Sequence, residues 1–177
     1  MRIKKKIFAI IGSARTNSSN EQLVKKLAEL TAEKWSVTIF EGPGRLPHFN
    51  PDLDNERPPF EVVEFRQQIT EADGVIICTP EYIFSLPGSL KNAIEWCVST
   101  TIFSRKPVGL ITASASGEKA QEELKLIMKT IEAEFTEETT LLIKGIKGKF
   151  DEEGNLTDEK AKTALIAFIR SFEKLLE

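Results

Sequence analysis

The sequence has few of the side chains from which metal sites and disulfide frameworks are built. It contains one histidine, His48, and two cysteines, Cys78 and Cys97, which lie 19 residues apart in apolar surroundings. That spacing matches neither a Cys-x-x-Cys redox pair nor a zinc-binding pattern. We therefore expect no metal ion and two buried free thiols in a reducing cytoplasm. We expect His48 to lie on the surface or in the wall of a site, without a catalytic role.

Long apolar runs and an excess of positive charge are also missing from the sequence. No stretch approaches the roughly 20 apolar residues that cross a bilayer. The start, MRIKKKIFAIIG, has an apolar run shorter than the core of a signal peptide, so we expect a first strand there. Lys and Arg number 24 against 27 Asp and Glu, which gives no basic surface for nucleic-acid phosphates. We expect neither membrane nor nucleic acid as a partner.

The composition is that of one ordinary folded domain. The chain has 177 residues, of which 41% are apolar and 29% are charged. This length supports one full domain and is short for two. We expect a single domain over residues 1–177.

Short apolar runs rich in Val and Ile alternate with segments of helical periodicity. The runs predict strands buried on both faces; they are KIFAIIG, SVTIF, DGVIICTP, PVGLITA and TTLLIKGI. The last helical segment carries a clear apolar stripe, formed by Ala161, Leu165, Phe168, Phe172 and Leu175. The alternation predicts an α/β fold of three layers, with helices on both faces of a five-stranded parallel sheet. The flavodoxin-like strand order 2-1-3-4-5 fits this pattern.

In such sheets the ligand binds beyond the carboxyl ends of the strands, near the point where the strand order reverses. The candidate loops are therefore residues 12–20, 79–88 and 112–119. Residues 41–59 hold five of the eight prolines and are unsuited to long regular structure. Leu46, Phe49 and Leu53 within this segment suggest that it packs as a wall of the site.

The loop after the first strand, GSARTNSSN, concentrates hydrogen-bond donors where a helix begins. The first amides of a helix lack partners and its dipole is positive there, so the loop suits an anion. Ser18 and Glu21 have the spacing of a capping box, as does the next pair along the chain. Capping alone explains the serines, whereas Arg15 adds a charged contact for a phosphate. The GxxxxGK[ST] and GxGxxG patterns do not occur here, which favours a terminal monophosphate over a pyrophosphate.

The loop after the third strand begins TPEYIFSLPG and is stiffened by prolines. Pro80 removes a donor where the strand ends, and Pro87 with Gly88 sets a turn before the next helix. Tyr82 and Phe84 either pack internally or face a flat aromatic ring. Both alternatives are open from the sequence.

These loops, together with LPHFNPDLD, PPFEVVEFRQQITEADGVIICTPEY and SLPGSLKNAIEW, resemble the NADPH-dependent FMN reductase family. Its members are flavodoxin-like oxidoreductases that include quinone, azo-dye and chromate reductases. The resemblance covers roughly residues 5–130. It implies an FMN cofactor, NADPH as electron donor, and a homodimer or homotetramer in the cytoplasm. The apolar residues Trp96, Val98, Ile102 and Phe103 fit either a core or a subunit interface.

The resemblance also implies positions for the cofactor. The family's phosphate loop, G-S-x-R-x-x-S-x-N, corresponds to Gly12, Ser13, Arg15, Ser18 and Asn20. Its P-E-Y-N loop along the isoalloxazine ring corresponds to Pro80, Glu81, Tyr82 and Ile83, so an isoleucine replaces the asparagine. The glycine-rich loop after the fourth strand is reduced here, with Ser114, Ser116 and Gly117 as the contacts at the flavin edge.

The function implied is an FMN-dependent NAD(P)H oxidoreductase that passes electrons from NADPH to a quinone, azo compound, metal ion or free flavin. Such a reaction needs no protein acid or base, and we assign no catalytic side chain. Two alternatives remain. One is an FMN electron carrier without an NADPH site, against which the mild net charge of -3 argues. The other is an interaction module with a flavodoxin fold that has lost activity at Ile83.

Overall fold

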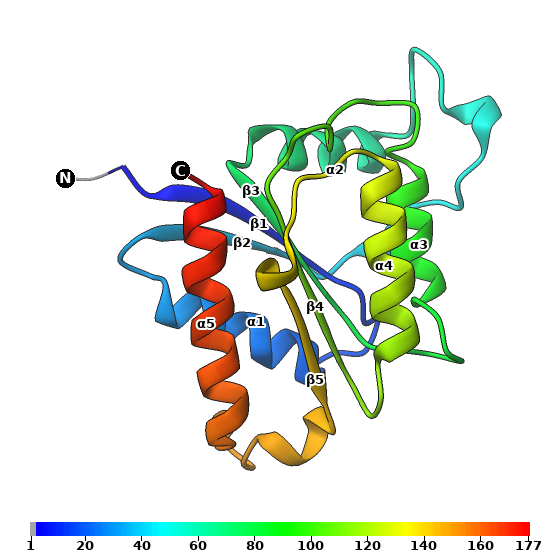
Figure 1. Cartoon of the computed structure of the whole chain (residues 1–177). Coiled ribbons are helices and arrows are strands. Elements are labelled where there is room, and N and C mark those ends of the chain that lie inside the picture. Colours follow the sequence, from blue (N-terminus) through cyan, green and yellow to red (C-terminus); the bar gives the residue numbers. More distant parts are fainter. Residues whose placement is uncertain (1–2) are drawn as a thin grey trace.

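The computed structural model describes residues 3–177 and has three layers (Figure 1). Five parallel strands form one sheet in the order β2-β1-β3-β4-β5. The strands are β1 Lys5–Ile11, β2 Trp35–Phe40, β3 Gly74–Thr79, β4 Val108–Ser114 and β5 Thr140–Lys144. The helices are α1 Ser19–Leu30, α2 Phe60–Glu71, α3 Gly88–Glu95, α4 Glu118–Thr130 and α5 Glu159–Leu175. The predicted fold class and strand order are confirmed.

The sheet separates two hydrophobic cores. On one face α1 and α5 pack against the strands, with Leu27 and Phe168 fully or almost fully buried. On the other face α2, α3 and α4 do so, with Phe65 and Leu124 at the centre. Successive side chains of a strand point to opposite faces, so a central strand such as β3 is buried at every residue.

The prediction that all five strands are buried on both faces is wrong for the two outer ones. β2 and β5 lie at the edges of the sheet; β5 alternates buried with partly exposed residues, and in β2 only Trp35 is buried. Each has a neighbouring strand on one side only, and the helices cover the middle of the sheet better than its edges. The runs SVTIF and TTLLIKGI are accordingly less uniformly apolar than DGVIICTP.

The register of the strands brings four loops to one edge of the sheet. One row of paired residues crosses it, formed by Ile11, Cys78, Ile111 and Leu141. Because the strands are parallel and end close to this row, the loops after β1, β3, β4 and β5 emerge side by side. Gly12 allows a close approach there, since a Cβ atom would lie 2.5 Å from Thr79 Oγ1.

Residues 41–59 are irregular but attached to α3. Asn92 Nδ2 and Trp96 Nε1 both donate to the carbonyl oxygen of Pro47, at 3.0 and 2.7 Å. The backbone N–H of Phe49 donates to Asn92 Oδ1 at 2.7 Å, and its ring meets that of Trp96 edge-on. Figure 1 shows the segment in cyan at the margin of the molecule. The part of the segment beside α3 is packed, as predicted, whereas residues 51–57 are mostly exposed.

Single side chains around this segment divide between core and surface. Leu46 is buried as expected, but Leu53 is 46% exposed, so its predicted packing is wrong. His48 is exposed. Of the residues that fitted either a core or an interface, Trp96 and Phe103 belong to the core, Ile102 packs against it and Val98 is exposed. No helix within residues 3–177 has the length and apolarity needed to cross a bilayer.

Candidate functional site

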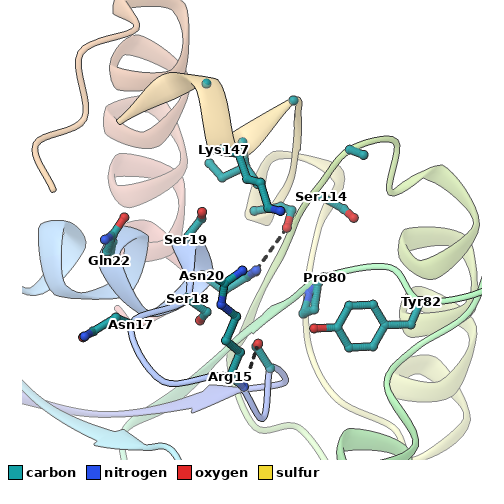
Figure 2. Close-up of a pocket in the computed structure, with 16 residues that line it drawn as sticks. Arg15, Asn17, Ser18, Ser19, Asn20, Gln22, Pro80, Tyr82, Ser114 and Lys147 are labelled. Carbon is teal, nitrogen blue, oxygen red and sulfur yellow. Dashed lines mark hydrogen bonds between the residues drawn. The ribbon is translucent and has the colours of Figure 1, made fainter. Parts of the chain in front are cut away.

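A cavity of about 790 Å³ opens at the edge of the sheet where the four loops emerge (Figure 2). Its size is in the range of small-molecule sites. Seven of the ten residues predicted to bind a cofactor line it: Ser13, Arg15, Ser18, Asn20, Pro80, Tyr82 and Ser114. The other three, Glu81, Ile83 and Ser116, do not.

The loop after β1 is held in shape by its own side chains. Ser18 caps α1, and its hydroxyl accepts the N–H of Glu21 at 3.1 Å. The Glu21 carboxylate accepts the N–H of Asn17 at 2.8 Å rather than that of Ser18, so the predicted capping box is displaced by one residue. The Ser13 hydroxyl accepts the N–H of Arg15 at 3.2 Å. These bonds set the loop's conformation within the protein itself.

Donors remain at the mouth of this loop. The backbone N–H groups of Ser18, Ser19 and Asn20 have no acceptor within residues 3–177, and all three residues line the cavity. The Arg15 side chain extends into the cavity (Figure 2) and takes part in none of the ion pairs found within the same range. Free amides at a helix start together with a guanidinium favour an anion.

Asn20 has a structural task as well as a place in the lining. Its side chain is buried, and Nδ2 donates to the carbonyl oxygen of Ala113 at 3.1 Å (dashed in Figure 2). Its Oδ1 lies 3.3 Å from the Cys78 thiol, which donates to it. Asn20 therefore ties the start of α1 to β3 and β4. One N–H of its amide is left for a ligand.

The loop after β3 presents a stiff, partly apolar wall. Tyr82 and Ser85 exchange two backbone hydrogen bonds, at 3.0 and 3.1 Å. Ile83 and Phe84 form the tip between them, with φ of 51° and 56° and exposed fractions of 96% and 76%. Tyr82 is also exposed and lines the cavity beside Pro80. The alternative of internal packing is therefore wrong for Tyr82 and Phe84.

Glu81 points away from the cavity and caps α4. The residue that precedes this helix, Gly117, has no side chain with which to cap it. The Glu81 carboxylate instead accepts the backbone N–H groups of Lys119 and Ala120, at 2.9 and 3.1 Å. A carboxylate at the positive end of a helix is favourably placed. Glu81 thus attaches the cavity wall that contains Pro80 and Tyr82 to the start of α4.

A second carboxylate from α4 fixes the same loop. Glu123 accepts the hydroxyl of Ser85 at 2.6 Å and the N–H of Leu86 at 3.0 Å. The Ser114 hydroxyl lines the cavity at the end of β4, whereas Ser116 is exposed outside it. The loop after β3 is therefore joined to α4 through Glu81 and Glu123.

The loop after β5 completes the cavity. It was not predicted from the sequence to line the site. Residues Gly145–Gly148 line it, and Lys147 extends its side chain inward. Asn17, Ser19 and Gln22 line it too without having been assigned. The signal was available: the glycine-flanked Ile-Lys pair follows the weakest apolar run, and loops after parallel strands share one edge of the sheet.

Neither cysteine is suited to nucleophilic chemistry. Both are free and buried, as predicted. Burial raises the pKa of the Cys78 thiol far above its ordinary value and that of Cys97 to about 12. Within residues 3–177 no group of three His, Cys, Asp or Glu residues is placed to hold a metal ion.

A smaller cavity of about 280 Å³ lies on the other side of the β1 loop. Its lining includes Ser13 and Arg15 from that loop and Glu41, Gly44 and Arg45 from the segment after β2. The beginning of residues 41–59 therefore borders the candidate site, whereas His48 lines neither cavity.

Comparison with known proteins gives a consistent result. The sequence model of the family described as NADPH-dependent FMN reductase matches residues 5–146. The chain is 41% identical over 113 residues to a 2-hydroxy-1,4-benzoquinone reductase from Burkholderia sp, covering 62% of this chain and 60% of that protein. It is 32% identical over 136 residues to a quinone reductase from Escherichia coli K12, covering 73% and 72%.

A solved structure is similar over almost the whole chain. The flavoenzyme NAD(P)H:(acceptor) oxidoreductase FerB from Paracoccus denitrificans has a TM-score of 0.76 and 29% identity, covering 96% of this chain and 98% of that one. The sequence matches to the first two curated relatives span only 60% and 59% of their lengths. The family match covers well over half of the chain, and the chain therefore belongs to the NADPH-dependent FMN reductase family.

Proposed function

We propose that the cavity binds FMN and that the protein passes electrons from NADPH through the bound flavin to a small acceptor, with quinones as the favoured class. One observation carries the proposal. In a chain of this family, one cavity is lined by the unpaired amides and guanidinium of the β1 loop and by the stiff wall that carries Tyr82. The names of two relatives, both quinone reductases, support the class of acceptor.

The donors fit the phosphate of FMN. A phosphate monoester carries a charge of about −1.5 to −2 at neutral pH and three strong acceptor oxygens. Arg15 and the free N–H groups of Ser18, Ser19 and Asn20 can satisfy these oxygens. The Ser13 hydroxyl adds a donor, because its interaction with Arg15 N–H uses only its oxygen lone pair.

The walls after β3 and β4 fit the rest of the cofactor. Pro80 and Tyr82 offer a flat, partly apolar surface to a ring, and Ser114 adds a hydroxyl at its margin. Ile83 offers no side-chain amide, so polar contacts at that point are left to the backbone. Ile83, Glu81 and Ser116 lie outside the cavity lining, so the proposal includes no contact of their side chains with the cofactor.

Bound FMN would supply the hydride and electron chemistry. The chain's own residues would bind the cofactor, orient it and leave one side accessible to small molecules. The described lining contains no Asp, Glu, His or Cys residue. No side chain of these types is therefore placed to move a proton in the cavity, and we assign no catalytic side chain.

Steady-state oxidation of NADPH by the FMN-loaded protein, with 1,4-benzoquinone as acceptor, tests the proposal. We expect a rate well above that of the same concentration of free FMN. A rate no greater than that of free FMN, in a protein that retains the flavin, would contradict the proposal and favour the alternative of an FMN electron carrier. A colourless protein that does not bind added FMN would leave the interaction module. A parallel assay with NADH measures the preference for the donor.

We also propose a homodimer or homotetramer that works in the cytoplasm. The exposed apolar tip of the β3 loop, Ile83 and Phe84, supports a subunit contact beside the cavity. The two buried free thiols support a reducing compartment. A molar mass in dilute solution equal to that of one chain, measured by light scattering, would contradict the oligomer.

A further inference from the structure

We infer that Lys147 is a second cationic contact for the cofactor phosphate, and that it faces Arg15 across the cavity. The inference rests on the proposed FMN site. Arg15 and Lys147 are the only charged residues in the described lining. Figure 2 shows their side chains extending into the cavity from opposite sides, one from the β1 loop and the other from the β5 loop.

The β5 loop holds Lys147 in a defined place. Ile146, immediately before it, is 4% exposed and belongs to the core under α1 and α5. The N–H of Gly145 donates to the carbonyl oxygen of Ala115 at 3.2 Å, which joins the loop to the end of β4. Gly145 has a φ of 63°, a conformation that glycine adopts without strain. The buried Ile146 and the bond to Ala115 hold the loop in place, and Lys147 itself is exposed.

Lys147 differs from its neighbouring lysines in having no acidic partner. Lys144 pairs with Glu118 at 2.5 Å, and Lys149 pairs with Asp158 at 3.2 Å. Lys147 takes part in none of the ion pairs found within residues 3–177. Like Arg15, it is left with its charge directed into the cavity.

This arrangement is unfavourable without an anion. Two cations that converge on one space repel each other, and the positive end of the α1 dipole adds to the repulsion. The protein as a whole has a net charge of -3, so the local excess is not a general property of its surface. A phosphate with two negative charges balances both side chains, whereas Arg15 alone balances one.

The charge of Lys147 favours the phosphate over the flavin ring, because the phosphate is anionic and the oxidised ring is neutral. Figure 2 shows Lys147 between Ser19, at the start of α1, and Ser114, at the end of β4. The ring of Tyr82 lies beyond Pro80, in the wall after β3. We therefore expect Lys147 to distinguish FMN from riboflavin, which has the same ring and no phosphate.

Binding of FMN and riboflavin to flavin-free protein, followed by flavin fluorescence, tests the inference with the variant Lys147→Gln. We expect the Kd for FMN to rise about tenfold, as for the loss of one hydrogen bond to a charged group. The Kd for riboflavin should change by less than about twofold. Lys147→Arg should keep most of the affinity for FMN, because it retains the charge and donors. The increase in Kd should shrink at high salt.

Lys144→Gln is the matched control. It removes the same charge three residues before Lys147, and Lys144 belongs to an exposed ion pair outside the cavity lining. It should leave both affinities unchanged. If the wild type prefers FMN to riboflavin and Lys147→Gln has the same preference, the inference is wrong and the proposed function stands. An equal loss for both flavins also overturns it. A wild type that binds neither flavin overturns the inference and the proposed function together.

Discussion

At the scale of single residues, several predicted ligand contacts turn out to hold the protein together. Asn20 donates to a carbonyl 93 residues away, and Glu81 caps a helix 38 and 39 residues away. The sequence placed both residues at the correct edge of the sheet. It did not reveal their partners, because these belong to strands and helices that approach only after folding.

Ile83 is the clearest case of local backbone strain. A β-branched side chain at a φ of 51° is uncommon, since Cβ crowds the backbone there. Within one chain the side chain is 96% exposed, so little packing inside the subunit offsets this strain. We expect Ile83→Asn to raise the free energy of unfolding by about 1 kcal/mol, because asparagine tolerates this conformation. Urea denaturation measures the change.

Val98→Asn is a suitable control for Ile83→Asn. Val98 is also an exposed β-branched residue, at 61%, and its φ is not positive. Its replacement should change stability by less than about 0.5 kcal/mol. A similar gain for both variants would show that polarity, and not relief of backbone strain, stabilises the protein.

At the scale of elements, the start of α4 depends on a residue from another segment. Glu81→Ala should lower the free energy of unfolding by about 1 to 2 kcal/mol, as for loss of a helix cap with two charge-assisted hydrogen bonds. It should also weaken FMN binding, since Pro80 and Tyr82 adjoin Glu81 in the cavity wall. Thermal denaturation and a flavin titration measure the two effects.

Glu122→Ala provides the comparison on α4 itself. Glu122 is exposed and its pair with Lys119 lies on the surface, so its loss should matter little. If the two alanine variants are equally stable, Glu81 does not act as a cap.

The segment after β2 is fastened by an ion pair at its centre. Asp54 Oδ1 and Arg66 Nη2 lie 2.7 Å apart, with side chains 5% and 15% exposed, and Arg66 Nε also donates to the Trp96 carbonyl at 2.7 Å. Burial raises the pKa of Asp54. Hydrogen bonds with Ser99 and Arg66 and the charge of Arg66 lower it by more, so the pKa lies below its ordinary value.

A lowered folded-state pKa means that the Asp54 carboxylate stabilises the protein above its unfolded pKa, which is about 3.9. The contribution is lost as the pH falls through the folded-state pKa. We expect Asp54→Asn to lower the free energy of unfolding by about 3 kcal/mol at pH 7, because Arg66 is left unpaired. The difference from wild type should narrow below about pH 4. Urea denaturation across this range measures it.

The exposed Asp52, two residues away, is the matched control for this pH dependence. Asp52→Asn should leave stability close to that of the wild type at every pH. A loss at Asp54 that stays constant down to pH 2 would exclude titration of its carboxylate as the cause.

The sequence predicted which strands and helices exist better than it predicted their burial and the roles of the loops that follow them. Central strands are recognisable as apolar runs. Five such runs that alternate with helical stripes are compatible with few sheet topologies. The edge strands were judged too buried, since edge position is a property of the assembled sheet. The β5 loop was not predicted to line the site, because β5 carries the weakest apolar run. Lys147 was therefore not assigned to the site.

At the scale of the whole molecule, the two cores and the cavity have separate roles. The cores bury both cysteines and support a rigid sheet. The sheet in turn brings four distant loops to one edge, where polar and cationic groups gather that no single loop contains. Family membership and this arrangement lead to the same proposal, an FMN site that is specific for the phosphate end.

Direct comparison of FMN and riboflavin binding to the flavin-free protein tests that central proposal. Two or more charge-assisted contacts to the phosphate should make FMN bind at least about a hundredfold more tightly than riboflavin. Arg15→Ala should remove about tenfold or more of this preference and leave riboflavin affinity unchanged. Equal affinities for the two flavins, or no binding of either, would contradict it.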